Sequence, residues 1–233
     1  MQPPERPRRR DCDSSKALPQ VAKSSSIPGP TANRLGLILR ELQHCQRSGQ
    51  MTIRSGFLAR RLGLSDSQIR RDLAQLGQLG KRGVGYDVIE LIARLRNMLG
   101  TDGQWRTILV GLGNLGSALV GYRSFREQGF QLVAIYEADP TKTGQTIDGV
   151  PVLPIDSIEA TLPKLNVDLA ILAVPTEAAT AVAERLYRLG IGGILNFAPV
   201  TLNQSPSTAI IDVDLAIEMQ RLAFAVVNRQ RSS

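Results

Sequence analysis

From about Thr31 onward, apolar residues recur at the spacing of a helix. Leu35, Leu39 and Leu42 are four and three positions apart, with Ile38 beside them. Residues at these spacings share one side of a helix, so the pattern predicts a helix with one apolar face.

Residues 55–77 (SGFLARRLGLSDSQIRRDLAQLG) predict two helices joined by a short turn. Ser55 can cap the first helix and Ser65 the second, where Gln68 follows at the spacing of a capping box. The buried stripe of the second helix is expected to consist of Ile69, Leu73 and Leu76.

A basic, glycine-rich loop and one more helix complete this half of the chain. The glycines of KRGVGY (81–86) permit a tight turn. Apolar residues then recur on one side of a predicted helix over residues 87–99, and GTDG (100–103) is typical of a linker. Two helices, a turn and a basic loop are the parts of a winged helix-turn-helix domain, expected here over residues 27–100.

Beyond the linker, short apolar strands alternate with helices. This alternation predicts an α/β fold with a parallel sheet covered on both faces, a Rossmann arrangement expected over residues 104–211. Helices are expected over 115–128 and 176–189, and strands over 105–110, 130–136, 150–154, 168–175, 192–197 and 207–213.

The last predicted helix, LAIEMQRLAFAVVNRQ (215–230), is apolar on nearly all sides, and Asp212 and Asp214 precede and cap it. Such a helix is normally buried on several sides, which one sheet does not provide at a chain end. We expect residues 212–230 to pack against a partner subunit; docking on the sheet of the same chain is the alternative.

The sequence GLGNLG follows the strand at 105–110 directly and opens a helix. In this context Gly111 allows a tight turn, Gly113 lets the backbone approach a pyrophosphate, and Gly116 permits close helix–strand packing. Asn114 and Leu115 begin the helix, whose free N–H groups can face the phosphates. The motif predicts a dinucleotide site.

Glu137 ends the next strand, 21 residues after Gly116. An acid at this place can accept hydrogen bonds from the adenosine ribose and repels a 2′-phosphate, which favours NAD over NADP. Lys142 lies nearby and weakens that preference. Two further loops follow strands and are expected to line the same site through Pro175, Thr176, Asn196, Phe197, Ala198 and Pro199.

The formal net charge of +7 is unevenly distributed. Residues 1–103 hold 18 Lys and Arg against 9 Asp and Glu, and residues 104–233 hold 10 against 12. This asymmetry indicates that only the first half meets a polyanion such as DNA. The expected DNA-contacting residues are Gln68, Arg70 and Arg71 on the recognition helix, Arg60 and Arg61 before it, and Lys81 and Arg82 in the wing.

The composition argues against an enzyme. The single histidine, His44, lies in the basic half, and residues 104–233 contain neither histidine nor cysteine to serve a dehydrogenase. Cys12 and Cys45 suggest neither a disulfide framework nor a zinc site, so reduced thiols, a cytoplasmic location and no metal are expected. The sequence contains no run of about 18 apolar residues, so no membrane span is expected. Residues 1–26 are expected to form a disordered basic tail.

Over residues 27–230 the chain resembles the Rex family of redox-sensing transcriptional repressors. The segments that carry the resemblance are the run from QIRRDL to KRGVGYDV, then GNLGSALVGY, ILAVP, GILNFAPV and VDLAIEMQRLAF. Three features depart from the family: AQLGQLG lacks the usual aromatic residues before the wing, Glu137 stands where Asp is common, and the cationic tail is atypical.

The resemblance implies a homodimer with domain-swapped C-terminal helices, bound to a pseudo-palindromic operator. NADH would release the DNA, whereas NAD⁺ would compete for the pocket and leave the protein competent for DNA. By the same resemblance, Tyr122 and Asp214 would contribute to the cofactor site and form an inter-subunit switch with Arg40.

Three alternatives remain at this point. The chain can be a Rossmann-type regulator that binds CoA or another nucleotide. It can be a small NAD-dependent oxidoreductase with a basic accessory domain. It can also be a DNA-binding scaffold that responds to no nucleotide.

Overall fold

The computed structural model describes residues 27–80 and 84–231, and the chain divides into two compact units between Gly103 and Gln104. The predicted tail at residues 1–26 lies outside the described residues, as do Lys81 and Arg82 of the predicted wing. Each unit has its own hydrophobic core.

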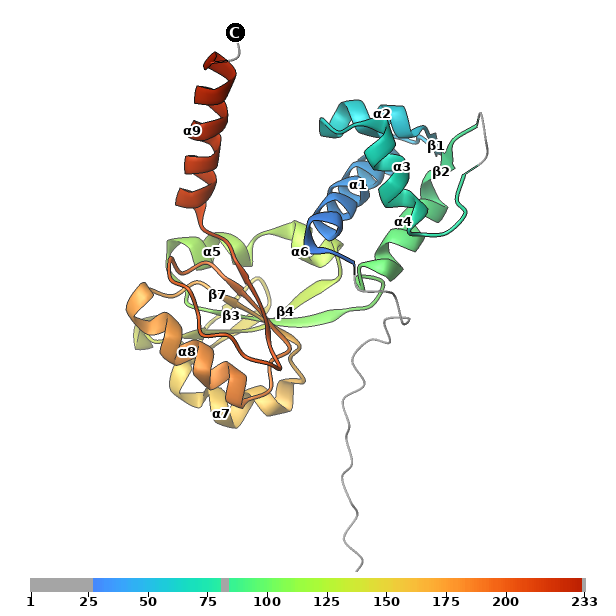
Figure 1. Cartoon of the computed structure of the whole chain (residues 1–233). Coiled ribbons are helices and arrows are strands. Elements are labelled where there is room, and N and C mark those ends of the chain that lie inside the picture. The colour runs from blue at the N-terminus through green and yellow to red at the C-terminus, as the bar shows by residue number, and fades with distance from the viewer. Residues whose placement is uncertain (1–26, 81–83, 232–233) are drawn as a thin grey trace, which may run out of the picture. The chain divides into compact units, whose positions relative to one another are not determined.

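The first unit is a helical domain with one small antiparallel ribbon (Figure 1). Its core joins residues from all four helices, among them Leu35, Leu58, Ile69 and Leu91, each at most 1% exposed. Its elements are α1 (Gly29–Arg47), β1 (Thr52–Ile53), α2 (Ser55–Leu62), α3 (Asp66–Ala74), β2 (Tyr86–Asp87) and α4 (Val88–Met98).

Side-chain caps fix where two of these helices begin. The Ser65 hydroxyl accepts a hydrogen bond from the Gln68 N–H at 3.1 Å, as the sequence predicts, and Asp87 does the same for the Glu90 N–H at 2.8 Å. The prediction for Ser55 is wrong: Arg54 takes the N-cap position and Ser55 is the first helical residue.

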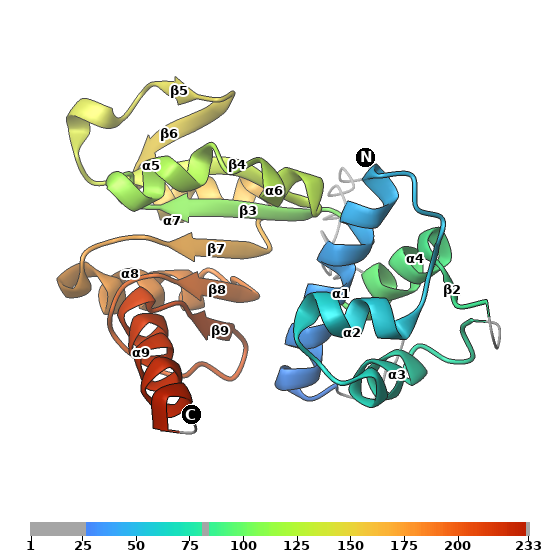
Figure 2. The ribbon, with the colours of Figure 1, turned by 90° about the horizontal axis from the view of Figure 1, so that it is seen from above.

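The second unit is built on a seven-stranded sheet in the order β5-β6-β4-β3-β7-β8-β9. Figure 2 shows the strands side by side. All neighbouring pairs are parallel except β5 with β6. Counted along the chain, the parallel strands have the order 3-2-1-4-5-6, which is that of a Rossmann domain. The predicted α/β class is confirmed. The strands are β3 (Trp105–Val110), β4 (Phe130–Glu137), β5 (Thr146–Ile147), β6 (Val150–Pro154), β7 (Leu169–Leu172), β8 (Gly193–Asn196) and β9 (Ala209–Asp212).

The helices of this unit cover the two faces of the sheet unequally. One face packs against α7 and α8 through buried residues such as Ile158, Leu186 and Ile194. The other carries α5 and α6 and keeps an open apolar groove of about 410 Å³, which reaches β9 at Ile211. Helices therefore lie on both faces, as the sequence predicts, but α5 and α6 leave part of their face open. The helices are α5 (Asn114–Val120), α6 (Arg123–Glu127), α7 (Ile158–Thr161), α8 (Thr176–Arg188) and α9 (Leu215–Arg231), with short 3₁₀ turns at Pro140–Lys142, Ile155–Ser157 and Leu162–Leu165.

The helix predicted over 115–128 is two helices in the structure. Gly121 is the C-cap of α5 and Tyr122 the N-cap of α6. Apolar periodicity continues across the break, which hides it from a pattern analysis, whereas glycine is a poor helix former and favours an end at this place.

Helix α9 extends away from the sheet (Figure 1). The Asp214 carboxylate caps it by accepting hydrogen bonds from the Ala216 and Ile217 N–H groups at 2.8 and 3.2 Å. Asp212, the other predicted cap, belongs to β9 instead. Residues 215–230 are all exposed, so α9 does not dock on the sheet of its own unit.

Candidate dinucleotide site and nucleic-acid interface

The residues predicted to bind a dinucleotide come together at one edge of the sheet. Because β3, β4, β7 and β8 are parallel, their carboxyl ends meet at the same edge, where the glycine motif, Glu137 and the loops after residues 172 and 196 follow them. The chain reverses its direction of winding between β3 and β7. Ligands of open α/β sheets bind at such a switch point.

The three glycines of the motif have different surroundings. Gly111 has a φ of +98°, and a Cβ there would collide with the Ala173 carbonyl. A Cβ on Gly116 would collide with the Gly111 carbonyl. At Gly113, a Cβ would meet no atom of the described residues within 4 Å. Gly111 and Gly116 therefore hold the turn and its packing, and Gly113 leaves space beside the backbone.

Glu137 binds the backbone of the glycine loop and of its own turn. One carboxylate oxygen accepts the Leu112 N–H at 2.5 Å, and the other accepts those of Ala138 and Asp139 at 2.7 and 2.9 Å. Burial raises the pKa of this carboxyl, but the three hydrogen bonds together outweigh it and lower the pKa below its ordinary value. Glu137 is thus a carboxylate at neutral pH.

Lys142 holds the same turn from the other side. Its Nζ donates to the Leu112 carbonyl at 3.3 Å and lies 4.0 Å from an Asp139 carboxylate oxygen. Leu112 is therefore held by an anion at its N–H and a cation at its carbonyl. The sequence placed Lys142 near the ribose but offered no sign of this contact.

The two other loops differ in what they expose. Pro175 is the N-cap of α8, and both it and Thr176 are exposed. In the second loop Pro199 is exposed and Phe197 half-buried, whereas Asn196 and Ala198 are buried.

The three residues of the expected switch lie on separate elements. Tyr122 is 54% exposed between α5 and α6 and meets the Phe125 ring edge-to-face at 5.0 Å. Asp214 is the cap of α9. Arg40 belongs to the first unit, on the exposed side of α1.

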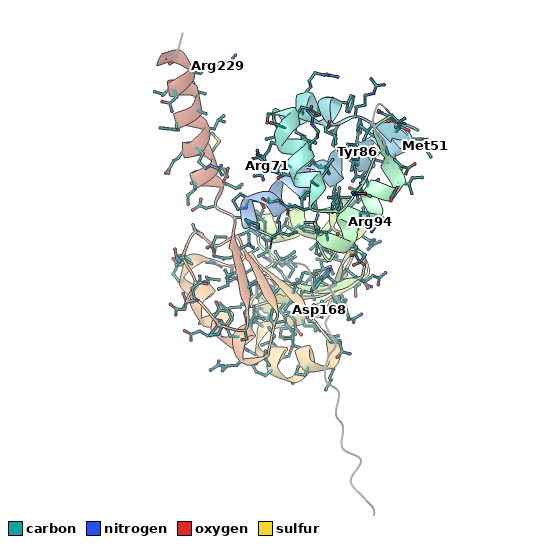
Figure 3. The ribbon with its side chains drawn as sticks, turned by 45° about the vertical axis from the view of Figure 1, so that its right-hand side comes forward. Met51, Arg71, Tyr86, Arg94, Asp168 and Arg229 are labelled. Atoms are coloured by element: carbon teal, nitrogen blue, oxygen red, sulfur yellow. The ribbon has the colours of Figure 1, made fainter. Side chains whose placement is uncertain are left out.

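The predicted DNA-contacting residues of α3 are partly engaged with their neighbours. Arg70 forms an ion pair with Asp66, and the Gln68 amide nitrogen donates to Asp72 at 2.8 Å. The Gln68 amide oxygen faces Arg71 instead of accepting the Ser65 N–H, so the predicted capping box is not closed. Arg71 is exposed on α3 (Figure 3) and lies 3.5 Å from the Gln68 amide oxygen. Arg71 is therefore well placed to reach a phosphate or a base edge.

One of the two arginines of α2 is engaged by a neighbouring helix. Arg60 is exposed, whereas the Arg61 Nε donates to a Glu41 carboxylate oxygen of α1 at 2.7 Å. Both remain on the surface of the first unit, and Arg61 is 52% exposed.

A buried ion pair in the first unit was missed by sequence reasoning. Arg34 of α1 donates to both carboxylate oxygens of Asp72 at 2.6 and 2.8 Å, and Asp72 is 1% exposed. The hydrogen bond from Arg34 is the main influence on the pKa of Asp72 and lowers it, although burial acts in the opposite direction. An aspartate after two arginines gives no signal of burial, because its partner lies 38 residues away.

Within residues 27–80 and 84–231, no cluster of His, Cys, Asp and Glu side chains is suited to hold a metal ion. No helix in the same ranges is long and apolar enough to cross a membrane. Cys45 is buried as a free thiol, and burial raises its pKa.

Two family models match the chain in separate regions. The CoA binding domain matches residues 102–200, and the "Putative DNA-binding protein N-terminus" matches residues 26–74. The first covers the glycine motif and the sheet edge, and the second covers α1 to α3.

Curated relatives match nearly the whole chain. The redox-sensing transcriptional repressor Rex of Rhodopirellula baltica is 44% identical over 89% of this chain and 87% of its own. That of Carboxydothermus hydrogenoformans is 42% identical over 88% of this chain and 98% of its own.

Solved structures of one protein, RSP, described as a Rex-family repressor, have the same fold. RSP in complex with beta-NAD⁺ and operator DNA matches with a TM-score of 0.81 and 32% identity, over 88% of this chain and 95% of that chain. RSP in complex with beta-NADH matches with a TM-score of 0.79 and 30% identity, over 88% and 97%.

Proposed function

The chain belongs to the Rex family of redox-sensing transcriptional repressors, and on that premise we propose that it binds operator DNA and releases it when NADH occupies the Rossmann unit. The family consists of regulators, so the protein is a regulator rather than an enzyme. The observation that carries the proposal is the open space at Gly113 beside the Glu137 carboxylate, in a chain whose other unit presents arginines on a helix-turn-helix.

In this proposal the glycine motif holds the pyrophosphate and Glu137 accepts a ribose hydroxyl. Three backbone N–H groups already occupy the Glu137 carboxylate, which keeps it ionised and hostile to a 2′-phosphate. NAD(H) is therefore preferred to NADP(H). The rest of the cofactor site consists of Asn114, Leu115, Pro175, Thr176, Phe197, Ala198 and Pro199, with Tyr122 and Asp214 at the nicotinamide end. Asn196, which the sequence also placed in this site, is buried beneath the last of these loops and accepts the Ala198 N–H.

The DNA-binding domain of the proposal is residues 27–100, with α3 in the major groove. Gln68, Arg70 and Arg71 of α3 contact bases or phosphates in this proposal, and Arg60 and Arg61 contact the flanking backbone. Lys81 and Arg82, which lie outside the described residues, are proposed as the contacts of the wing. A protein with operator DNA as its partner acts in the cytoplasm, which is the location we propose.

We propose a homodimer in which residues 212–230, which contain nearly all of α9, pack on the partner. The argument is the pair of unpartnered apolar surfaces in one unit. Phe224 and Leu222 of α9 are 69% and 56% exposed, and the groove beside α5 and α6 is lined by apolar residues such as Leu119 and Phe125. Contiguous apolar side chains left exposed on a soluble protein mark association sites.

The mechanism requires NADH to bind the DNA-incompetent state more tightly than the DNA-competent one. DNA must then weaken NADH binding by the same factor, because linkage is reciprocal. Arg40, Tyr122 and Asp214 are the residues proposed to respond to the redox state of the nicotinamide.

The test is fluorescence anisotropy of a labelled pseudo-palindromic operator, titrated with the protein at one fixed salt concentration. NADH is expected to weaken operator binding by about 5–150-fold, the range of typical allosteric couplings, and NAD⁺ much less. Operator binding indifferent to both nucleotides would overturn the proposal.

A second candidate ligand is CoA, which the match of residues 102–200 to the CoA binding domain favours. The same titration with CoA separates the two. CoA carries its phosphate on the ribose 3′-oxygen, next to the position that Glu137 is proposed to bind, so the proposal predicts no release by CoA. Release by CoA but not by NADH would establish the alternative.

A further inference from the structure

We propose that Asn196 is a positioning residue that ties the ligand loop after β8 to strand β9 and thereby to the start of α9. The inference rests on the proposed function, because it concerns how the nucleotide site communicates with the proposed dimer helix. It assigns Asn196 to that link rather than to direct contact with the nucleotide.

The Asn196 amide is fully buried and joins two parts of the chain. Its nitrogen donates to the Val200 carbonyl at 2.9 Å and to an Asp212 carboxylate oxygen at 2.8 Å. Its oxygen accepts the Ala198 N–H at 3.0 Å. Both N–H groups are thus engaged within the protein, and an amide with 0% exposure has no surface to offer a ligand.

The backbone continues the link to α9. The Asn196 carbonyl accepts the Val213 N–H at 2.8 Å, at the point where β9 leaves the sheet. The next residue, Asp214, caps α9 through the Ala216 and Ile217 N–H groups. Asn196 therefore binds the two residues that precede Asp214, Asp212 and Val213, while its amide also holds the loop.

The position of β9 makes this link effective. It is the last strand of the sheet and, among residues 27–80 and 84–231, pairs with β8 alone, along Gly193–Asn196. A strand held on one side shifts at lower cost than a central one. A movement of the loop at Ala198 and Val200 must either break buried hydrogen bonds, which costs about 1–3 kcal/mol for each group left unpaired, or carry Asp212 with it.

The test removes the β9 partner of Asn196, which is the Asp212 carboxylate. Asp212→Ala removes the acceptor and leaves the loop bonds of Asn196 in place, whereas the control Asp212→Asn keeps an acceptor oxygen. For each protein, NADH affinity is measured by fluorescence, and operator affinity with and without NADH by anisotropy.

The affinities of Asp212→Ala for NADH, and for the operator without NADH, are expected to stay within about threefold of those of the wild type. The variant should lose most of the effect of NADH on operator affinity, which is expected to be about 5–150-fold in the wild type. Asp212→Asn is expected to keep it. Reduced coupling at an unchanged thermal midpoint is a result that a merely structural role would not produce.

Full coupling in Asp212→Ala, with a wild type that NADH releases, would overturn this inference alone. A wild type that NADH does not release would overturn the proposed function itself. Should Asp212→Ala fail to fold, hydrogen exchange of the wild type decides: NADH must change the protection of the Val213 and Ala216 N–H groups, and unchanged protection overturns the link.

Discussion

The three glycines of GLGNLG differ in what a side chain would meet, and this difference makes a test at the scale of single residues. Gly113→Val places its Cβ where no described atom lies within 4 Å, at an ordinary φ of −77°. We expect its stability to stay within about 1 kcal/mol of the wild type. The side chain fills the space proposed for the pyrophosphate, so NADH binding should weaken by about tenfold or more.

Gly116→Val is the contrasting variant. Its Cβ would collide with the Gly111 carbonyl, so it should destabilise the second unit by about 1–3 kcal/mol or more. Urea unfolding gives the stabilities, and titration of NADH fluorescence gives the affinities. NADH binding that survives Gly113→Val unchanged would argue against a pyrophosphate at this loop.

Roles that depend on chain-local geometry are visible in the sequence at this scale. The cap at Ser65 follows from neighbours in the chain and is confirmed. The amide contacts of Gln68 and Asn196 are not visible, because a competing partner decides them. Gln68 has the spacing to close a capping box, yet its amide oxygen faces Arg71 and its nitrogen donates to Asp72. The partner of Asn196 is 16 residues away on another strand.

At the scale of elements, the Arg34–Asp72 pair fixes the recognition helix α3 against α1. Asp72→Ala would leave Arg34 without its partner and release Gln68, so we expect a loss of about 1.5–3 kcal/mol in the stability of the first unit at pH 7. Urea unfolding followed by circular dichroism measures it. Asp66→Ala is the matched control, because its ion pair with Arg70 is exposed and should cost little.

The pH dependence of that loss tests its electrostatic origin. The folded-state pKa of Asp72 is lowered, so its contribution is fully present above the ordinary carboxyl value of 3.8 and is lost as pH falls through the lower folded value. The stability difference between wild type and Asp72→Ala should therefore shrink below about pH 4. A difference that does not change between pH 5 and pH 2 would identify a packing effect instead.

Strands and long helices were predictable as elements, because each carries a periodic pattern over several residues. The division into α5 and α6 was not, since the apolar spacing runs through Gly121 and Tyr122. The hairpin of β5 and β6 has only two residues in its first strand, too short for any period to appear.

At the scale of the whole molecule, the order of strands and helices along the chain was enough to predict the Rossmann sheet. Alternation and right-handed crossovers leave few topologies open. The open groove was not predictable, because a sequence does not tell how much of a sheet face its helices leave uncovered. An apolar helix and an apolar groove in one unit then suggest the same partner, a second copy of the chain.

Phe224→Glu tests this dimer, because it places a charge on α9 at a side chain that is 69% exposed in the single chain. Burying that charge in an interface should cost at least about 2 kcal/mol, or roughly thirtyfold in the dimer dissociation constant. Sedimentation at several protein concentrations measures it. Operator affinity should fall when the dimer is lost, because binding at the second half-site then no longer benefits from the tether to the first.

Gln220→Glu supplies the control, since it adds the same charge at a polar position of the same helix. It should leave both the dimer and operator binding nearly unchanged. If Phe224→Glu remains a dimer at all concentrations, α9 does not form the interface. If the variant is a monomer but binds the full operator as tightly as the wild type, the two winged helices do not act as a pair. That result would contradict recognition of a pseudo-palindromic operator by a dimer.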